Sequence, residues 1–182
     1  MARVPFTSWY GHLLTISTPR IMTSSPRGLV LHISDGMWGK NHAHLIPNLN
    51  GLASTFNSTN YPAHFGIDAQ GNIAQYIDTS KQDRATERGG DWFSVECCAF
   101  RGDALTDSQI TAAGFLFALL RETYKTFPLD LADSVVDSGL AYHSLFLTDI
   151  EKKDPKKHSN CPGALVIAQR ASIIERAKSI FG

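Results

Sequence analysis

Two histidines and one cysteine in this chain occur where a zinc ion could be bound. His32 lies near the end of the apolar run 28–34, His143 follows the apolar stretch 139–142, and Cys161 precedes an apolar-periodic segment. We expect the histidines at strand ends and the cysteine at a helix start, positions that can converge in space. Three N, N and S ligands leave the fourth tetrahedral position that a catalytic zinc keeps for water. The pattern therefore predicts a candidate metallohydrolase, although a lone histidine at a strand end is more often structural, and the spacing matches no zinc finger.

Apolar periodicity and turn signals predict the elements that must position these residues. Short apolar runs predict strands over residues 28–34, 61–67, 73–78, 92–100 and 139–143, the second and third forming a hairpin around the glycine-containing loop 68–72. Helical spacing of apolar residues predicts helices over residues 46–56, 106–125 and from 162 onward. Thr106 and Gln109 have the form of a capping box, and Pro162 suits a first helical position. Strands interleaved with helices predict an α/β fold with a central mixed β-sheet flanked by helices.

Length and composition limit the classes of protein that this chain can be. The 182 residues suit one domain, residues 1–182, in which residues 1–27 are expected to form an irregular arm and residues 35–44 a loop. Lys plus Arg equals Asp plus Glu at 17 each, which argues against nucleic acid as a partner. No apolar run has the length of a membrane helix, and the N-terminus lacks the layout of a signal peptide, so we expect synthesis in the cytoplasm and no membrane insertion.

The cysteine content argues against a disulfide framework. The chain has 3 cysteines, an odd number, and Cys97 and Cys98 are adjacent. We expect this pair to pack as small apolar residues within a strand.

Four stretches occur in a characteristic order along the chain. They are Val30-Leu31-His32-Ile33-Ser34, AHFGIDAQGNIAQY at residues 63–76, Phe93-Ser94-Val95-Glu96, and Tyr142-His143 with Cys161-Pro162-Gly163. This order resembles the zinc-dependent N-acetylmuramoyl-L-alanine amidases, the family that also contains the T7-type phage lysozyme and the peptidoglycan recognition proteins. The resemblance covers roughly residues 28–180. It implies the amidase and recognition-protein fold, and hydrolysis of the amide bond between N-acetylmuramic acid and L-alanine in peptidoglycan.

The resemblance also implies a role for individual residues. His32, His143 and Cys161 fall on the ligands of a single Zn²⁺, and Glu96 falls on the carboxylate that many members use as general base. Other members use a tyrosine just before the histidine of the hairpin, where this chain has Ala63. Because Glu96 lies among apolar strand residues, we expect its pKa to be raised toward neutrality, as suits a proton shuttle. The alternative is a surface carboxylate on an exposed strand face.

Further residues are expected to stabilise the oxyanion or contact the substrate. The family commonly has Lys or Thr two residues before the third ligand; this chain has Ser159 there, and either Ser159 or Lys157 could stabilise the tetrahedral oxyanion. Trp38, in the loop after His32, and His158, in a basic segment, are expected substrate contacts. His64 is either a groove residue that contacts substrate or a buried structural histidine. Residues 83–88 lack the Trp-His pair that relatives carry after the hairpin, so substrate contacts there must differ.

The expected substrate is peptidoglycan or a soluble muropeptide. A catalytic domain alone fits a phage endolysin, an injected toxin with an immunity protein as partner, or a recycling enzyme acting on cytoplasmic muropeptides; we favour a lytic role on the cell wall after release or delivery. One alternative is a recognition module that holds peptidoglycan without cutting it, usually after loss of a zinc ligand. Another is a zinc peptidase that cuts within the stem peptide. Metal content tests the first alternative, and product analysis tests the second.

Overall fold

A mixed six-stranded sheet forms the centre of the computed structural model, which describes residues 4–15, 20–22, 24–35, 37–38, 44–45, 48–86, 90–153 and 160–181. The strand order is β1-β6-β5-β7-β2-β8, with β5 and β6 antiparallel and all other neighbours parallel. The six strands are β1 (Ser8–Trp9), β2 (Gly28–Ile33), β5 (Phe65–Ile67), β6 (Ile73–Gln75), β7 (Phe93–Cys97) and β8 (Gly139–Tyr142). A separate antiparallel pair joins β3 (Met37–Trp38) to β4 (His44–Leu45). All but Leu45 of this pair lies in residues 35–44, the stretch predicted to be a loop.

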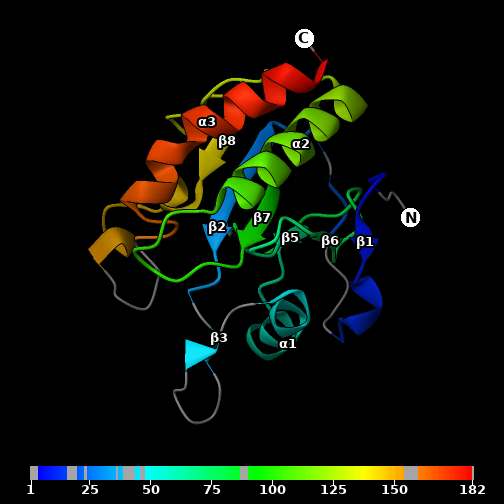
Figure 1. Ribbon diagram of the computed structural model, residues 1–182, viewed down its shortest axis with the longest axis vertical. Helices are drawn as coiled ribbons and strands as arrows, with labels where there is room; N and C mark the ends of the chain where they lie inside the picture. Colours follow the sequence, from blue (N-terminus) through cyan, green and yellow to red (C-terminus); the bar gives the residue numbers. More distant parts are fainter. Residues whose placement is uncertain are drawn as a thin grey trace.

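Helices cover both faces of the sheet. Figure 1 shows α2 (Asp107–Tyr124) and α3 (Ala164–Phe181) side by side across one face. The third helix, α1 (Leu49–Thr59), packs on the opposite face, where Leu49 and Leu52 lie against Gly66 of β5. Short 3₁₀ turns occur at η1 (Gly11–Leu13), η2 (His143–Phe146) and η3 (Glu151–Lys153). The predicted α/β fold with a mixed, helix-flanked sheet is thus confirmed. In the described part of the chain, no helix is both long and apolar enough to cross a membrane.

Side chains alternate between the two faces of the sheet along β2 and β7, and this alternation determines which of them lie on the same face as His32. In β2, Leu29, Leu31 and Ile33 are buried in the core beneath α2 and α3, and in β7 the residues at 93, 95 and 97 join them there. Successive side chains of a strand point to opposite faces. His32 and Glu96 therefore lie on the face away from α2 and α3, and the parallel register pairs them directly.

Polar side chains cap the first turns of α1 and α2, and the observed helix starts agree only partly with the predicted ones. α2 begins at the predicted capping box, in which Gln109 N donates to Thr106 Oγ1 (3.1 Å) and Thr106 N donates to Gln109 Oε1 (3.0 Å). α1 begins three residues later than predicted, because the side chain of Asn48 accepts a hydrogen bond from Gly51 N at 2.9 Å and so forms the N-cap. α3 begins at Ala164 rather than Pro162, which follows Cys161 through a cis peptide bond.

One strand lies inside the arm that was predicted to be irregular. β1 adds to the sheet edge in parallel to β6, with Ser8 paired to Ala74. Beside it, Tyr10 N donates to Gln75 O (2.8 Å) and Val4 N donates to Gln75 Oε1 (2.8 Å). A strand of two residues carries no detectable periodicity, which is why the sequence did not predict it.

A buried arginine fixes α3 against β8, the strand that leads to His143. Arg170 is 5% exposed and donates from Nη1 to the carbonyls of Ala132 (3.0 Å) and Leu140 (3.1 Å). Its Nη2 lies 2.6 Å from Asp133 Oδ1, and its guanidinium lies 4.6 Å from the centre of the Tyr142 ring. The position of the His143 segment thus depends on α3.

We expect Arg170→Met to lower the free energy of unfolding by about 2–4 kcal/mol, because buried acceptors lose charged donors. Lys178→Met is the matched control, since Lys178 Nζ also joins α3 to the segment before β8, through Asp130 at 3.0 Å, but both side chains are more than half exposed. An exposed pair of this kind contributes at most about 1 kcal/mol. Urea denaturation of the two metal-free variants measures the difference, and equal losses would contradict this account.

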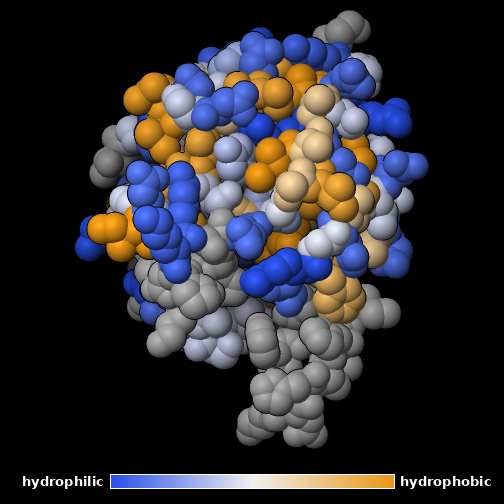
Figure 2. All heavy atoms as spheres, turned by 90° about the vertical axis from the view of Figure 1, so that its left-hand side faces the viewer, coloured by the Kyte–Doolittle hydropathy of each residue, from blue (hydrophilic) through white to orange (hydrophobic). Residues whose placement is uncertain are grey.

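Polar and apolar side chains are mixed on the outer surface beside β8 and α3. Figure 2 shows this face, on which hydrophobic atoms alternate with hydrophilic ones. Such a mixture is ordinary for a globular protein, because folded proteins have too few polar atoms to cover their surface.

Candidate metal centre

The structure brings His32, His143 and Cys161 together. One ligand atom of each lies within 4.8 Å of the others, and the two imidazole rings stack with their centroids 4.6 Å apart. His32 is the last residue but one of β2, His143 directly follows β8, and Cys161 precedes α3. β2 and β8 are parallel neighbours, so their carboxyl ends meet at one edge of the sheet. The convergence of two strand ends and a helix start is as the sequence analysis expected.

Cys161 is held against the backbone of β2. Its side chain lies in the core, with the residue 9% exposed, and Ile33 N donates to its Sγ at 3.4 Å. Burial, and next the negative charge of Glu96, raise the pKa of the Cys161 thiol, so this sulfur is protonated in the metal-free protein. A bound cation acts in the opposite direction and converts a coordinating thiol to thiolate.

The donor set suits zinc. Imidazole nitrogen and thiolate sulfur are zinc ligands, with bond lengths of about 2.0–2.1 Å and 2.3 Å. Around a tetrahedral ion these lengths put donor atoms about 3.3–3.6 Å apart. Small side-chain rotations would bring the observed donors, which lie within 4.8 Å of one another, to that spacing. The residues therefore fit one zinc ion, with a coordination position left for another group.

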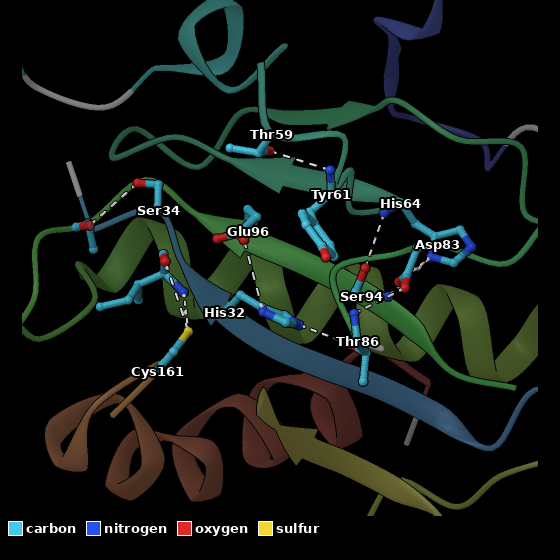
Figure 3. A network of polar contacts seen from close by, with 12 residues as sticks. His32, Ser34, Thr59, Tyr61, His64, Asp83, Thr86, Ser94, Glu96 and Cys161 are labelled. Atoms are coloured by element: carbon cyan, nitrogen blue, oxygen red, sulfur yellow. Dashed lines mark hydrogen bonds and ion pairs between the residues drawn. The ribbon is translucent and has the colours of Figure 1, made fainter. Parts of the chain in front are cut away.

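Glu96 lies beside His32 on the same face of the sheet (Figure 3). Its Oε1 is 3.9 Å from His32 Nδ1, its side chain is 15% exposed, and its Oε2 is buried with no hydrogen-bond partner among the described residues. Burial, and next the charge of Asp83, raise the pKa of Glu96 to about 8. The direction of the shift and its largest cause, burial, are as predicted, but Phe93 and Val95, the neighbours expected to surround Glu96, point to the other face.

His64 is fully buried and forms hydrogen bonds through both ring nitrogens. Its Nδ1 lies 3.0 Å from Asp83 Oδ2, and its Nε2 lies 2.8 Å from the carbonyl oxygen of Lys81. The residue is 0% exposed, and its backbone N–H donates to Ser94 Oγ at 3.2 Å. Of the two alternatives that the sequence left open, this geometry favours the structural histidine over a residue that contacts substrate.

Sequence reasoning missed two buried residues, Thr86, which contacts His32, and Asp83, which contacts His64. Thr86 Oγ1 lies 3.1 Å from His32 Nε2, and the Thr86 backbone N–H donates to Asp83 Oδ1 at 3.3 Å. Thr86 is 2% exposed and Asp83 is 9% exposed. The sequence signal was limited to two polar residues in a segment without periodicity, where a solvated loop is the usual interpretation.

The remaining predicted site residues are not placed by side-chain geometry. Lys157, His158 and Ser159 lie outside the described residues, and their proposed roles stay predictions. Trp38 belongs to β3, where its backbone pairs with His44, but its side chain is not among those that the structure describes.

An open hollow of about 400 Å³ lies beyond the carboxyl ends of β2 and β7. It is lined by Asp35, Phe100, Arg101 and Asp103. Within this lining, Arg101 Nη2 forms an ion pair with Asp35 Oδ2 at 2.5 Å. Charges of both signs therefore lie at the same end of the sheet as the three predicted ligands.

Comparison with known structures shows which proteins share this fold. The sequence matches no protein-family model, and no curated protein is significantly similar to it. The structure nevertheless resembles solved N-acetylmuramoyl-L-alanine amidases and peptidoglycan recognition proteins along nearly its whole length. The fold that the sequence resemblance implied is therefore confirmed.

Three of these structures illustrate the likeness. The Staphylococcus aureus hydrolase AmiA is 13% identical with a TM-score of 0.68, covering 98% of this chain and 85% of AmiA. The Clostridium intestinale endolysin LysCS, an N-acetylmuramoyl-L-alanine amidase, is 14% identical with a TM-score of 0.65, covering 95% and 98% of the two chains. Drosophila PGRP-LB is 14% identical with a TM-score of 0.63, covering 94% of each chain.

Proposed function

We propose that this chain is a peptidoglycan amidase that hydrolyses the bond between N-acetylmuramic acid and L-alanine, with one zinc ion held by His32, His143 and Cys161. The observation that carries the proposal is the convergence of these three side chains within 4.8 Å, beside a buried carboxylate, in the fold of LysCS and AmiA. A recognition module that only binds peptidoglycan would need neither the complete ligand set nor the carboxylate.

Glu96 is the residue proposed to move the proton. Amide hydrolysis adds water to the lactyl carbonyl carbon, breaks the carbon–nitrogen bond and delivers a proton to the departing nitrogen of L-alanine. A carboxylate whose pKa is raised to about 8 can take the proton of the attacking water and then give it to that nitrogen. Zinc, when bound, would supply acidification of the water and polarisation of the carbonyl oxygen.

The proposed substrate is polymeric peptidoglycan, and the proposed role is lytic. The likeness to LysCS, an endolysin, supports a lytic role. The other candidate is the one that the family resemblance left open, a recycling enzyme that acts on soluble muropeptides. Comparing the rates on intact sacculi and on soluble muropeptides decides between them. A lytic enzyme releases stem peptides from sacculi at a rate comparable to that on fragments.

Mass spectrometry of digested peptidoglycan is the direct test of the activity. We expect stem peptides beginning at L-alanine together with glycan chains carrying free lactyl carboxylates. A chelator should abolish their release and added zinc should restore it, because the reaction requires the metal. Peptides cut inside the stem would instead establish a peptidase. Absence of cleavage by the zinc-loaded protein would support the recognition module.

A further inference from the structure

A chain of buried polar contacts extends from His32 away from the candidate metal centre (Figure 3). The His32 Nε2 atom contacts Thr86 Oγ1 at 3.1 Å, and the Thr86 backbone N–H donates to Asp83 Oδ1 at 3.3 Å. Asp83 Oδ2 lies 3.0 Å from His64 Nδ1, and His64 Nε2 lies 2.8 Å from Lys81 O. The His32, Asp83 and His64 side chains are 3%, 1% and 0% exposed. Water therefore has little access to these contacts.

The contact with Thr86 distinguishes the two nitrogens of His32. A neutral imidazole carries its proton on one nitrogen and a lone pair on the other. If Nε2–H donates to Thr86 Oγ1, the lone pair lies on Nδ1, and this is the atom on the side of Glu96, 3.9 Å from its Oε1. A histidine that binds a metal ordinarily donates its other ring N–H to a fixed acceptor, which sets both tautomer and ring orientation.

The position of the Thr86 hydroxyl depends in turn on Asp83. Residues 79–86 contain no helix or extended strand, and backbone hydrogen bonds fix only the part before Asp83 closely: Met22 N donates to Ser80 O (2.9 Å) and Gln82 N donates to Arg20 O (2.7 Å). Asp83 adds two side-chain contacts that reach the Thr86 end of the segment, one with the buried His64 ring and one with the Thr86 backbone. His64 is itself tied to β7 by the hydrogen bond from its N–H to Ser94 Oγ. The acceptor for His32 is therefore fixed to the same sheet that carries Glu96.

We propose that Thr86 is a positioning residue for the metal centre. Its hydroxyl accepts the Nε2–H of His32 and makes Nδ1 the coordinating atom, while the His64–Asp83 contact holds the Thr86 segment in place. This inference rests on the proposed zinc site and assigns a function to the stretch 83–86 that the sequence left without one. It also gives buried His64 a role in the site that involves no contact with substrate.

Zinc affinity of the purified full chain tests the proposal, measured by competition with a chromogenic chelator. Thr86→Val keeps the side-chain shape and removes the acceptor, so we expect a dissociation constant about 10- to 100-fold higher. Thr86→Ser keeps the hydroxyl and should restore most of the affinity. Thr79→Val is the matched control, because Thr79 is also 2% exposed but its Oγ1 bonds with Tyr124 Oη at 2.7 Å. This control should retain wild-type zinc affinity.

Nitrogen NMR of the zinc-loaded protein supplies a second readout that loss of stability alone would not change. We expect His32 to carry its proton on Nε2 and the metal on Nδ1. Wild-type affinity in Thr86→Val, no recovery in Thr86→Ser, or a metal on Nε2 would each overturn the positioning role. A wild-type protein that binds zinc in this manner but cuts no peptidoglycan would overturn the amidase alone. A wild-type protein that binds no zinc would overturn both.

Discussion

Glu96→Gln is expected to lower the rate of stem-peptide release by about 10²- to 10⁴-fold, the range lost when a general acid–base group is removed. The amide has the shape of the carboxylic acid but cannot accept and return a proton. Zinc content should remain at the wild-type level, because Glu96 is adjacent to the three predicted ligands but is not one of them. Initial rates on soluble muropeptides, with the metal content of the same sample, measure both quantities.

Stability and a surface variant separate this effect from general damage. Burial and the charge of Asp83 disfavour the ionised form of Glu96, so a neutral side chain should not lower the melting temperature of the metal-free protein. Glu122→Gln, on an exposed part of α2, removes a carboxylate that pairs with Lys125 and should leave the rate unchanged. Near-normal turnover in Glu96→Gln would remove this residue from the mechanism.

Local signals in the sequence were sufficient for the elements that form most of the fold. The capping box at Thr106, the glycine turn between β5 and β6 and the apolar run of β2 each depend on residues close in sequence. A helix boundary differed from the prediction where a single polar side chain determines it: Asn48 caps the N-terminus of α1 and so sets its first residue. β1 was not predictable, because its position depends on hydrogen bonds to Gln75, which is distant in sequence.

The candidate site was predictable only where the family resemblance supplied the missing long-range information. The pairing of His32 with Glu96 depends on the register of two strands 64 residues apart, and no local pattern reports that register. Asp83 and Thr86 were missed for a related reason: each contacts a buried histidine that is distant in sequence, His64 in the case of Asp83 and His32 in the case of Thr86. Polar residues in an aperiodic segment indicate a solvated loop unless buried partners elsewhere in the chain are known.

Cys161→Ala is expected to weaken zinc binding by roughly a thousandfold. If a site of this kind contributes on the order of 12 kcal/mol, the loss of one ligand in three removes about 4 kcal/mol. The remaining binding energy of about 8 kcal/mol corresponds to a dissociation constant of about 1 μM. Free zinc buffered well below about 1 μM should therefore raise the melting temperature of the wild type but not of this variant, since a ligand stabilises the folded state only at concentrations above its dissociation constant. Elemental analysis after dialysis, and thermal unfolding with and without zinc, measure the two effects.

Cys98→Ala is the matched control for this variant. Cys98 is also buried, at 4% exposed, but it packs with the α1 cluster rather than with the predicted ligands, so its loss should affect stability and not zinc binding. A full zinc complement in Cys161→Ala would contradict the ligand assignment, because the remaining imidazoles would then hold the ion without the sulfur. Loss of zinc in Cys161→Ala alone would tie the metal to the one cysteine that lies against the end of β2.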